Sequence, residues 1–350
     1  MKRIIAFFLL IWLFLPSTAF PQKVTFGEIK QLQSPQNPAI GFIIHGRAGV
    51  IVKGSMTPEK EKEYRAKLEE VVLAGYKALQ EGKSSLDAVE IAIRMMEDSP
   101  LFNAGKGAVF NSEGKNELDA SIMDGKTLAA GAVAAVHHVK NPITLARAVM
   151  EKSQNVMLTG DGAEKFAREQ KIEIVDETSK DEKGKGEKRK MGAESVVSAS
   201  PANSQSVASL SAGKAGGFGA VALDRKGNIA AGSSSGGIAN GKAGRVGEAA
   251  IIGAGTFANN NTCGVSGTGW GEYFIRLGVA RDISSMMEYQ ALPVQTAADR
   301  VIKQKLQKLG GDGGVIAMDK FGNMAISFNT EGMYRAYINS NGKPVVEIYK

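Results

Sequence analysis

The feature that most constrains this chain is a hairpin pattern that occurs twice. One copy covers residues 219–230 (GAVALDRKGNIA) and the other residues 314–325 (GVIAMDKFGNMA). In both copies, runs of small and apolar residues flank the sequence Asp-x-x-Gly-Asn. Such runs around a glycine-containing turn predict a β-hairpin. The repetition predicts two hairpins with equivalent roles in stacked sheets, and a buried hairpin by itself indicates a place in the core rather than a function.

Helix signals and further apolar runs fill the rest of the chain. Thr57 and Pro58 begin an amphipathic pattern that ends near Gln80, and Ser85 is expected to cap a second helix, 86–97. The other predicted helices cover 141–152, 271–279 and 293–309, and the other predicted strands cover 40–44, 108–110, 118–123 and 131–136. The last of these strands is nearly all apolar, which favours a central place. Sheets covered by helices are one of the permitted layer architectures.

Two stretches are expected to lie outside the folded core. Residues 1–19 combine a basic start, a short apolar run and small residues before Phe20, which predicts a cleaved secretory signal and a periplasmic or secreted protein. The apolar run is too short for a comfortable membrane span, so no membrane attachment is expected after signal removal. Residues 176–216 mix Glu, Lys and Gly and then Ser and Ala without an apolar period, which predicts a flexible linker. A single domain within residues 20–350 is expected to remain.

The net charge of +7 is concentrated in these two stretches. Lys2 and Arg3 lie in the signal, and residues 180–190 hold six basic and three acidic side chains. A nucleic-acid binder carries its positive charge on a folded face with aromatic residues nearby. The pattern therefore favours a solvated linker and no nucleic-acid partner. The three histidines and the single cysteine, Cys263, offer no metal-ligand spacing.

Short motifs around the first hairpin resemble one known family. They are LFNAGKG at 101–107, GGFGAVA at 216–222, GRVGE at 244–248 and GTG at 267–269, in this order. Together they are similar to the plant-type L-asparaginase/isoaspartyl peptidase family of the N-terminal-nucleophile hydrolases, from about Ile40 to Lys350 apart from the linker. The resemblance implies an α+β fold, the four-layer αββα sandwich. Residues 40–175 and 217–350 would correspond to the two subunits that family members form by self-cleavage. It also implies a homodimer and no required cofactor.

The resemblance places the family's catalytic residue at Gly217. Family members carry a threonine there; cleavage before it frees an amino terminus, and its hydroxyl becomes the nucleophile. Glycine has no side chain and can neither cleave the chain nor form an acyl-enzyme. A neighbouring threonine of the family corresponds to Ser235, which keeps the hydroxyl. Ser235 would need a base at hydrogen-bonding distance to attack, and the sequence supplies no obvious one.

The resemblance also implies a site for a small amino-acid or β-aspartyl ligand. Arg245 corresponds to the arginine that holds the substrate α-carboxylate, and Glu248 to an aspartate that binds the α-amino group. The extra methylene of Glu248 is expected to push its charge into the substrate space. Thr268 and Gly269 match the pair that lines the oxyanion site, although Trp270 follows where small residues are usual.

Three further correspondences surround this site. Asn103 matches an asparagine close to the family's active site. In the sequence HGRAG (45–49), Arg47 replaces a family glycine that supplies a positive φ or a close approach, and arginine is expected to fit neither. The segment 96–106 resembles the family's sodium-binding loop, whose backbone oxygens suit a hard cation. The carbonyl groups implied as sodium ligands are those of Met96, Glu97, Ser99, Phe102, Ala104 and Lys106.

Three functions remain open from the sequence. The first is an exported, non-catalytic relative that stays as one chain and keeps a small-ligand pocket. The second is a working hydrolase of L-asparagine or β-aspartyl dipeptides with a compensating nucleophile. The third is a scaffold that binds an anionic surface through residues 180–190. The departures from the family pattern gather where the chemistry would occur, at Arg47, Gly217, Ser235, Glu248 and Trp270, and this clustering favours the first.

Overall fold

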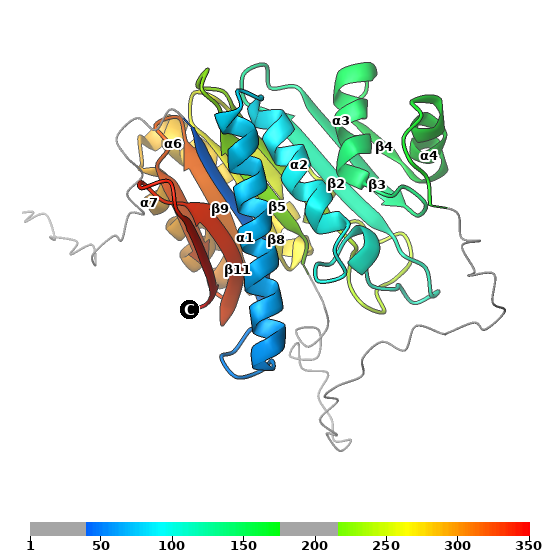
Figure 1. The fold of residues 1–350 in the computed structure, drawn as a ribbon, viewed down its shortest axis with the longest axis horizontal. Helices are drawn as coiled ribbons and strands as arrows, with labels where there is room; N and C mark the ends of the chain where they lie inside the picture. The colour runs from blue at the N-terminus through cyan, green and yellow to red at the C-terminus, as the bar shows by residue number, and fades with distance from the viewer. Residues whose placement is uncertain (1–39, 176–215) are drawn as a thin grey trace, which may run out of the picture. The chain divides into compact units, whose positions relative to one another are not determined.

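The computed structural model describes residues 40–175 and 216–350. The predicted signal and nearly all of the predicted linker, with its basic segment, lie outside these residues. The described chain forms two sheets with helices packed against them (Figure 1), which confirms the α+β class. The larger sheet has the strand order β12-β11-β1-β5-β6-β2-β3-β4, and the smaller has the order β10-β9-β8-β7.

The bounds of the elements are as follows. The larger sheet contains β1 (Gly41–Gly49), β2 (Leu118–Asp124), β3 (Ala130–Val136), β4 (Met157–Thr159), β5 (Phe218–Leu223), β6 (Ile229–Ser235), β11 (Gly332–Ile338) and β12 (Pro344–Tyr349). The smaller sheet contains β7 (Thr256–Ala258), β8 (Cys263–Gly269), β9 (Gly313–Asp319) and β10 (Met324–Phe328). The helices are α1 (Pro58–Gln80), α2 (Ser85–Glu97), α3 (Pro142–Lys152), α4 (Gly160–Glu169), α5 (Gly271–Leu277), α6 (Val279–Gln290), α7 (Val294–Asp299) and α8 (Gln307–Leu309), with the shorter or irregular η1 (Gly105–Gly107), η3 (Glu248–Ala250) and η4 (Arg300–Leu306).

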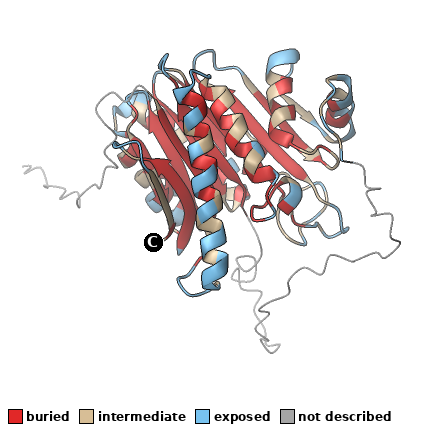
Figure 2. Cartoon of the chain, viewed as in Figure 1, coloured by how far each residue is buried: buried red, intermediate tan, exposed pale blue. Residues whose placement is uncertain are grey.

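Alternate residues of the buried strands point into two different cores, because successive side chains of a strand face opposite ways. In β1, Phe42 and Ile44 belong to the core that contains side chains of α1, α2 and α3, whereas Ile43 belongs to the core that contains the smaller sheet. The larger sheet contacts the smaller one through β1, β2, β5 and β6. The helices α6 and α7 also pack on the smaller sheet. The four-layer order that the resemblance implies stays a prediction. Figure 2 shows buried strands behind α1 and α2, with the exposed side of α1 turned outward.

The two predicted hairpins are confirmed, and they lie in different sheets. β5 pairs with β6 in the larger sheet, and β9 pairs with β10 in the smaller. Their turns are built alike: Asp224 Oδ1 accepts hydrogen bonds from the amides two and four residues later, and so does Asp319 Oδ1. β5 also contacts both β8 and β9. The hairpin that contains the predicted site is therefore central to both cores.

Side-chain caps start the first two helices. Thr57 caps α1 as predicted, with its hydroxyl accepting from Lys60 N at 3.2 Å. The cap of α2 is Ser84, not Ser85, because Ser84 and Asp87 form a reciprocal capping box. The neighbouring amide of Ser85 donates to Asp224 Oδ2 at 3.1 Å, which joins α2 to the β5–β6 turn.

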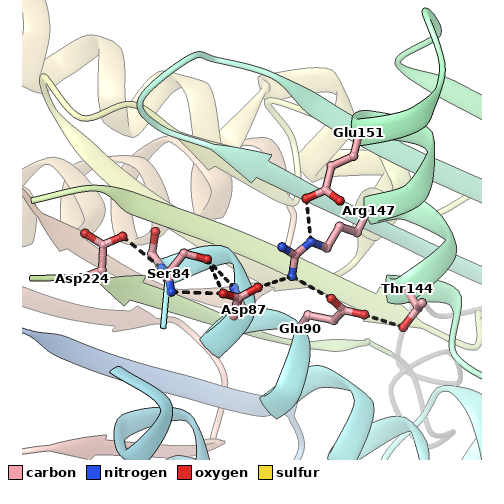
Figure 3. A network of polar contacts seen from close by, with 8 residues as sticks. Ser84, Asp87, Glu90, Thr144, Arg147, Glu151 and Asp224 are labelled. Carbon is pink, nitrogen blue, oxygen red and sulfur yellow. Dashed lines mark hydrogen bonds and ion pairs between the residues drawn. The ribbon is translucent and has the colours of Figure 1, made fainter. Parts of the chain in front are cut away.

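Figure 3 shows how this capping network continues into α3. Arg147 of α3 binds Asp87 and Glu90 of α2 and Glu151 of its own helix, at 2.7–2.8 Å. Thr144 adds a hydrogen bond to Glu90 at 2.7 Å. The network therefore holds α2 and α3 to each other, and α2 to the turn between β5 and β6.

Three other expectations were wrong. Residues 108–110 form no strand, since Val109 N instead donates to the side chain of Asn103. The apolar strand β3 is not central but lies next to the edge strand β4; its apolar character reflects α3 and α4, which pack on it. β1 does not end at His45 but continues to Gly49 through a bulge at His45/Arg47.

A buried chain of hydroxyl groups links the two sheets. His45 Nε2 of β1 lies 2.9 Å from Ser266 Oγ of β8, which lies 2.7 Å from Ser233 Oγ of β6. Thr256 of β7 completes the chain at 2.8 Å. Burial lowers the pKa of His45 to about 3, so the imidazole stays neutral and acts as a structural partner. In the described ranges, no helix is long and apolar enough to cross a bilayer.

Candidate active site

Gly217 lies at the head of β5, where the resemblance places the nucleophile. Its carbonyl oxygen accepts a hydrogen bond from Thr268 Oγ1 at 3.0 Å. A β-carbon placed on Gly217 would lie 2.2 Å from the carbonyl oxygen of Ser234 and 2.9 Å from Ser235 Cβ. Favourable carbon contacts are about 3.5–4.0 Å long. The main chain of β6 therefore approaches Gly217 too closely for a side chain in this backbone conformation.

Ser235 ends β6 beside Gly217 and is buried. Its hydroxyl oxygen accepts a hydrogen bond from Gly237 N at 3.1 Å. In the described part of the chain, no imidazole, amine or carboxylate is hydrogen-bonded to it. The structure thus brings Ser235 to the predicted position without a base that could activate it.

Asn103 joins three segments at this point. Its amide nitrogen donates to Gly237 O at 2.8 Å and, at 3.4 Å, to Gly216 O, the carbonyl group before Gly217. Its amide oxygen accepts from Val109 N at 3.1 Å. These contacts hold the loop after α2 against the end of β6 and the start of β5, as expected for a residue close to the site.

The two groups implied as oxyanion donors are already engaged within the chain. Thr268 and Gly269 end β8. The hydroxyl group of Thr268 donates its hydrogen bond to the carbonyl oxygen of Gly217. The Gly269 amide donates to Glu248 Oε1 at 3.3 Å. Gly269 has φ +158°, and a β-carbon there would lie 2.4 Å from Asp312 O, so this position requires glycine.

Glu248 closes the site from η3. Its carboxyl group is buried and turns toward the Gly269 amide, a contact that the resemblance does not predict. Burial raises the pKa of Glu248 to about 7, although Arg245 nearby opposes the shift. The carboxyl group of Glu248 therefore occupies the amide of Gly269, one of the two groups that the resemblance implies as oxyanion donors.

Arg245 is held by a partner that the sequence did not indicate. Its Nε and Nη2 donate to the two carboxylate oxygens of Glu272, in the first turn of α5, at 3.0 and 2.9 Å. Asp119 of β2 lies close by and accepts from Gly247 N at 3.0 Å. Burial raises the pKa of Asp119 to about 6. A charged residue within the apolar strand pattern of 118–123 was the signal that could have identified Asp119.

Trp270 and Arg47 border the site. Trp270 precedes α5 and packs edge-on against Tyr273, with ring centroids 4.9 Å apart. Arg47 has φ +151°, so the expectation that an arginine would not adopt the glycine conformation was wrong. Its aliphatic part approaches Gly216: Cγ would lie 3.7 Å from a β-carbon placed there.

The predicted sodium loop turns several carbonyl groups inward. The Glu97 carbonyl oxygen lies 2.4 Å from a β-carbon placed on Gly105, and the Phe102 carbonyl oxygen 2.0 Å from one on Gly107. Of the six implied ligands, the carbonyls of Phe102 and Ala104 each accept one amide hydrogen bond, whereas the Met96 carbonyl accepts from the amides of Asp98 and Ser99. A carbonyl oxygen has a second lone pair, so the bonds to Phe102 and Ala104 leave room for a cation. Sodium binding stays a prediction.

Comparison with known proteins identifies the family of the chain. The asparaginase family matches residues 38–348. The isoaspartyl peptidase of Escherichia coli (strain K12) is 46% identical over 312 residues, which are 88% of this chain and 95% of that protein. The isoaspartyl peptidase/L-asparaginase of Xenopus laevis is 41% identical over 301 residues, 86% and 92% of the two chains. The plant-type L-asparaginase of Pyrococcus abyssi (strain GE5 / Orsay) is 40% identical over 313 residues, 85% and 96% of the two chains.

The class that the fold and these matches define is that of the N-terminal-nucleophile hydrolases. Within it, the chain belongs to the asparaginase family, whose enzymes need no cofactor.

Proposed function

We propose that this chain is a non-catalytic member of the asparaginase family that does not cleave itself. The observation that carries the proposal is Gly217. Self-cleavage and acyl transfer both need a hydroxyl or thiol group at this position, and Ser234 O lies too close for a side chain there. Restoring the nucleophile therefore demands a change in the main chain as well as in the residue.

The engaged binding groups support the same proposal. An external amide substrate would need the Thr268 hydroxyl and the Gly269 amide, which bind Gly217 O and Glu248 in the chain itself. A hollow beside Arg245, lined also by Glu117, Gly237 and Lys242, has a volume of about 10 Å³. This is about the room that one water molecule needs. This hollow, which of the implied substrate-binding residues includes Arg245 alone, is too small to hold an amino-acid or β-aspartyl ligand.

The test combines intact mass and ammonia release. The purified chain is expected to give a single mass without cleavage, and no ammonia from L-asparagine or a β-aspartyl dipeptide. The Escherichia coli isoaspartyl peptidase, assayed in parallel, is the positive control. Two fragments that meet between Gly216 and Gly217, without added protease, or turnover near that of the control, would overturn the proposal.

One observation favours a second candidate, a hydrolase with a compensating nucleophile. Ser235 Cβ lies 2.9 Å from the place where a β-carbon of residue 217 would lie, so its hydroxyl is close to the predicted position. The missing base counts against it. If the native chain releases ammonia and the Ser235→Ala variant does not, this second candidate replaces the first.

Three further expectations enter the proposal. We infer that residues 1–19 direct export and are removed, that the mature chain forms a homodimer, and that the loop 96–106 binds a structural sodium ion. Sedimentation of the purified chain tests the second. Thermal unfolding in sodium against an equal concentration of tetramethylammonium tests the third, with higher stability expected in sodium.

A further inference from the structure

Arg47 has a backbone conformation that favours glycine. It lies at the bulge of β1, where the register with β11 shifts between His45 and Arg47, at φ +151°. A residue with a side chain in such a sparsely populated region is strained, and such residues cluster at ligand clamps and other functional sites. The conformation therefore suggests that the guanidinium group has a role.

The guanidinium of Arg47 lacks the partner that comparable arginines have. Its Nε is buried and makes no hydrogen bond, and no carboxylate of the described residues forms an ion pair with it. Most other arginines that are largely or partly buried bind a carboxylate, namely Arg65, Arg147, Arg245, Arg281 and Arg335, and Arg300 donates to the side-chain oxygen of Gln290. A buried donor without an acceptor destabilises the folded state, because it has lost its hydrogen bonds to water. An anion that reached this nitrogen would remove this destabilisation.

Arg47 lines a hollow that contains no acidic residue. The other lining residues are Gly46, Tyr64, Leu101, Phe102, Asn103 and Tyr334, and the volume is about 10 Å³. The rings of Tyr64 and Tyr334 stack with centroids 4.5 Å apart. Glu61, whose charge adds to burial in raising the pKa of Tyr334, is held by Arg65 and by the Tyr349 hydroxyl, both at 2.7 Å. No carboxylate among the residues that line this hollow therefore neutralises the positive charge of Arg47.

We propose that Arg47 binds one small anion in this hollow, a halide ion or a single carboxylate oxygen. The volume is that of about one water molecule, which is too small for a whole tetrahedral oxyanion such as phosphate. The bound anion would lie beside the junction of Gly216 and Gly217, which Arg47 Cγ approaches. Of the residues implied in substrate binding, the hollow includes Asn103 alone, so the proposal does not depend on the loss of catalysis.

Thermal unfolding of the full chain in different sodium salts tests the proposal. Chloride and acetate are compared with gluconate at equal ionic strength, because gluconate is too large to enter. At ten times its dissociation constant, a bound anion is expected to raise Tm by about 2–4 °C. Arg47→Gly should abolish this rise, and its own Tm in gluconate should not fall because glycine relieves the strain. Arg276→Ala, at an exposed arginine, is the matched control and should keep the rise.

Each outcome decides. A rise with chloride alone identifies a halide site, and a rise with acetate as well shows that a carboxylate oxygen enters. No rise in the native chain, or an equal rise in Arg47→Gly, overturns the proposal. If Arg47→Gly does not fold, a crystal of the native chain soaked in bromide decides instead. An anomalous peak at hydrogen-bonding distance from Arg47 Nε supports the site, and bromide bound only elsewhere refutes it.

Discussion

Replacing Gly217 with threonine tests whether one residue separates this chain from an active enzyme. In the present backbone, the new β-carbon would lie 2.2 Å from Ser234 O, 3.0 Å from the Ser234 carbonyl carbon and 2.9 Å from Ser235 Cβ. Two of these atoms are main chain and cannot rotate away. Overpacking of a buried position typically costs about 1–3 kcal/mol. We therefore expect Gly217→Thr to lower Tm by about 2–10 °C.

The same variant is expected to release no ammonia at a rate comparable to its relatives. Even with a hydroxyl group at residue 217, Glu248 still binds the Gly269 amide. A displacement of about 1 Å at a reacting group can reduce the rate about 10²-fold. Self-cleavage is expected to be slow for the same reason.

Two controls separate packing from chemistry. Gly217→Ala adds the β-carbon without the hydroxyl and should be destabilised as well. Gly49→Thr adds the same side chain at the end of β1, where no atom lies within 4 Å of the β-carbon position, and should leave Tm nearly unchanged. Calorimetry, an ammonia assay and gel analysis are the measurements. A Gly217→Thr variant that is as stable as the native chain and turns over asparagine like its relatives would refute the reasoning from these contacts.

Three other outcomes are expected. Burial raises the pKa of Glu97 from 4.5 to about 8, so the folded state holds this proton more tightly than the unfolded state does. The contribution of Glu97 to the free energy of unfolding is therefore greatest at low pH, and it falls by up to about 1.4 kcal/mol per pH unit between pH 4.5 and 8. Urea unfolding of Glu97→Gln should lack this part of the slope, with the exposed Glu331→Gln as control, and parallel curves for native and Glu97→Gln would contradict the assignment. Ser84→Ala removes the cap of α2 and should cost about 1 kcal/mol in urea unfolding, whereas an unchanged midpoint would show that the cap is dispensable. Amino-terminal sequencing of the exported protein should begin near Phe20, and a cytosolic chain that starts at Met1 would exclude export.

Local chemistry made part of the fold predictable from the sequence. The hairpin turns depend on an aspartate, a glycine and an asparagine within five residues, and the start of α1 depends on Thr57 and Pro58. β8 was missed for a physical reason. Its sequence, CGVSGTG, lacks alternating large side chains because the sheets approach closely there. A β-carbon on Gly264 would lie 2.7 Å from Val221 and Ile229, and one on Gly267 would lie 2.8 Å from Phe274.

The site shows the same division. Motif positions predicted which segments meet, and Asn103, Gly217, Ser235 and Thr268 do lie together. The pairing of Arg245 with Glu272 was not predictable, because it depends on how α5 turns back toward the loop of Arg245. Nor could the sequence show that Ser234 O approaches Gly217. The distance between two main-chain segments of a sheet does not depend on the type of their side chains, and the glycine at position 217 is the one residue that reflects the close approach.

The hold of Glu272 on Arg245 has a consequence for any amino acid dissolved around the protein. A side chain fixed in place competes with free ligands at an effective concentration that is of millimolar order even for flexible tethers. A free carboxylate that relied on this edge of the guanidinium would have to exceed that concentration to displace Glu272 half of the time. Free carboxylates at concentrations well below millimolar would then leave the pair intact. A ligand that displaces Glu272 must therefore make a second favourable contact elsewhere in the protein. The Arg245–Glu272 pair in this way selects against ligands that bind through a carboxylate alone.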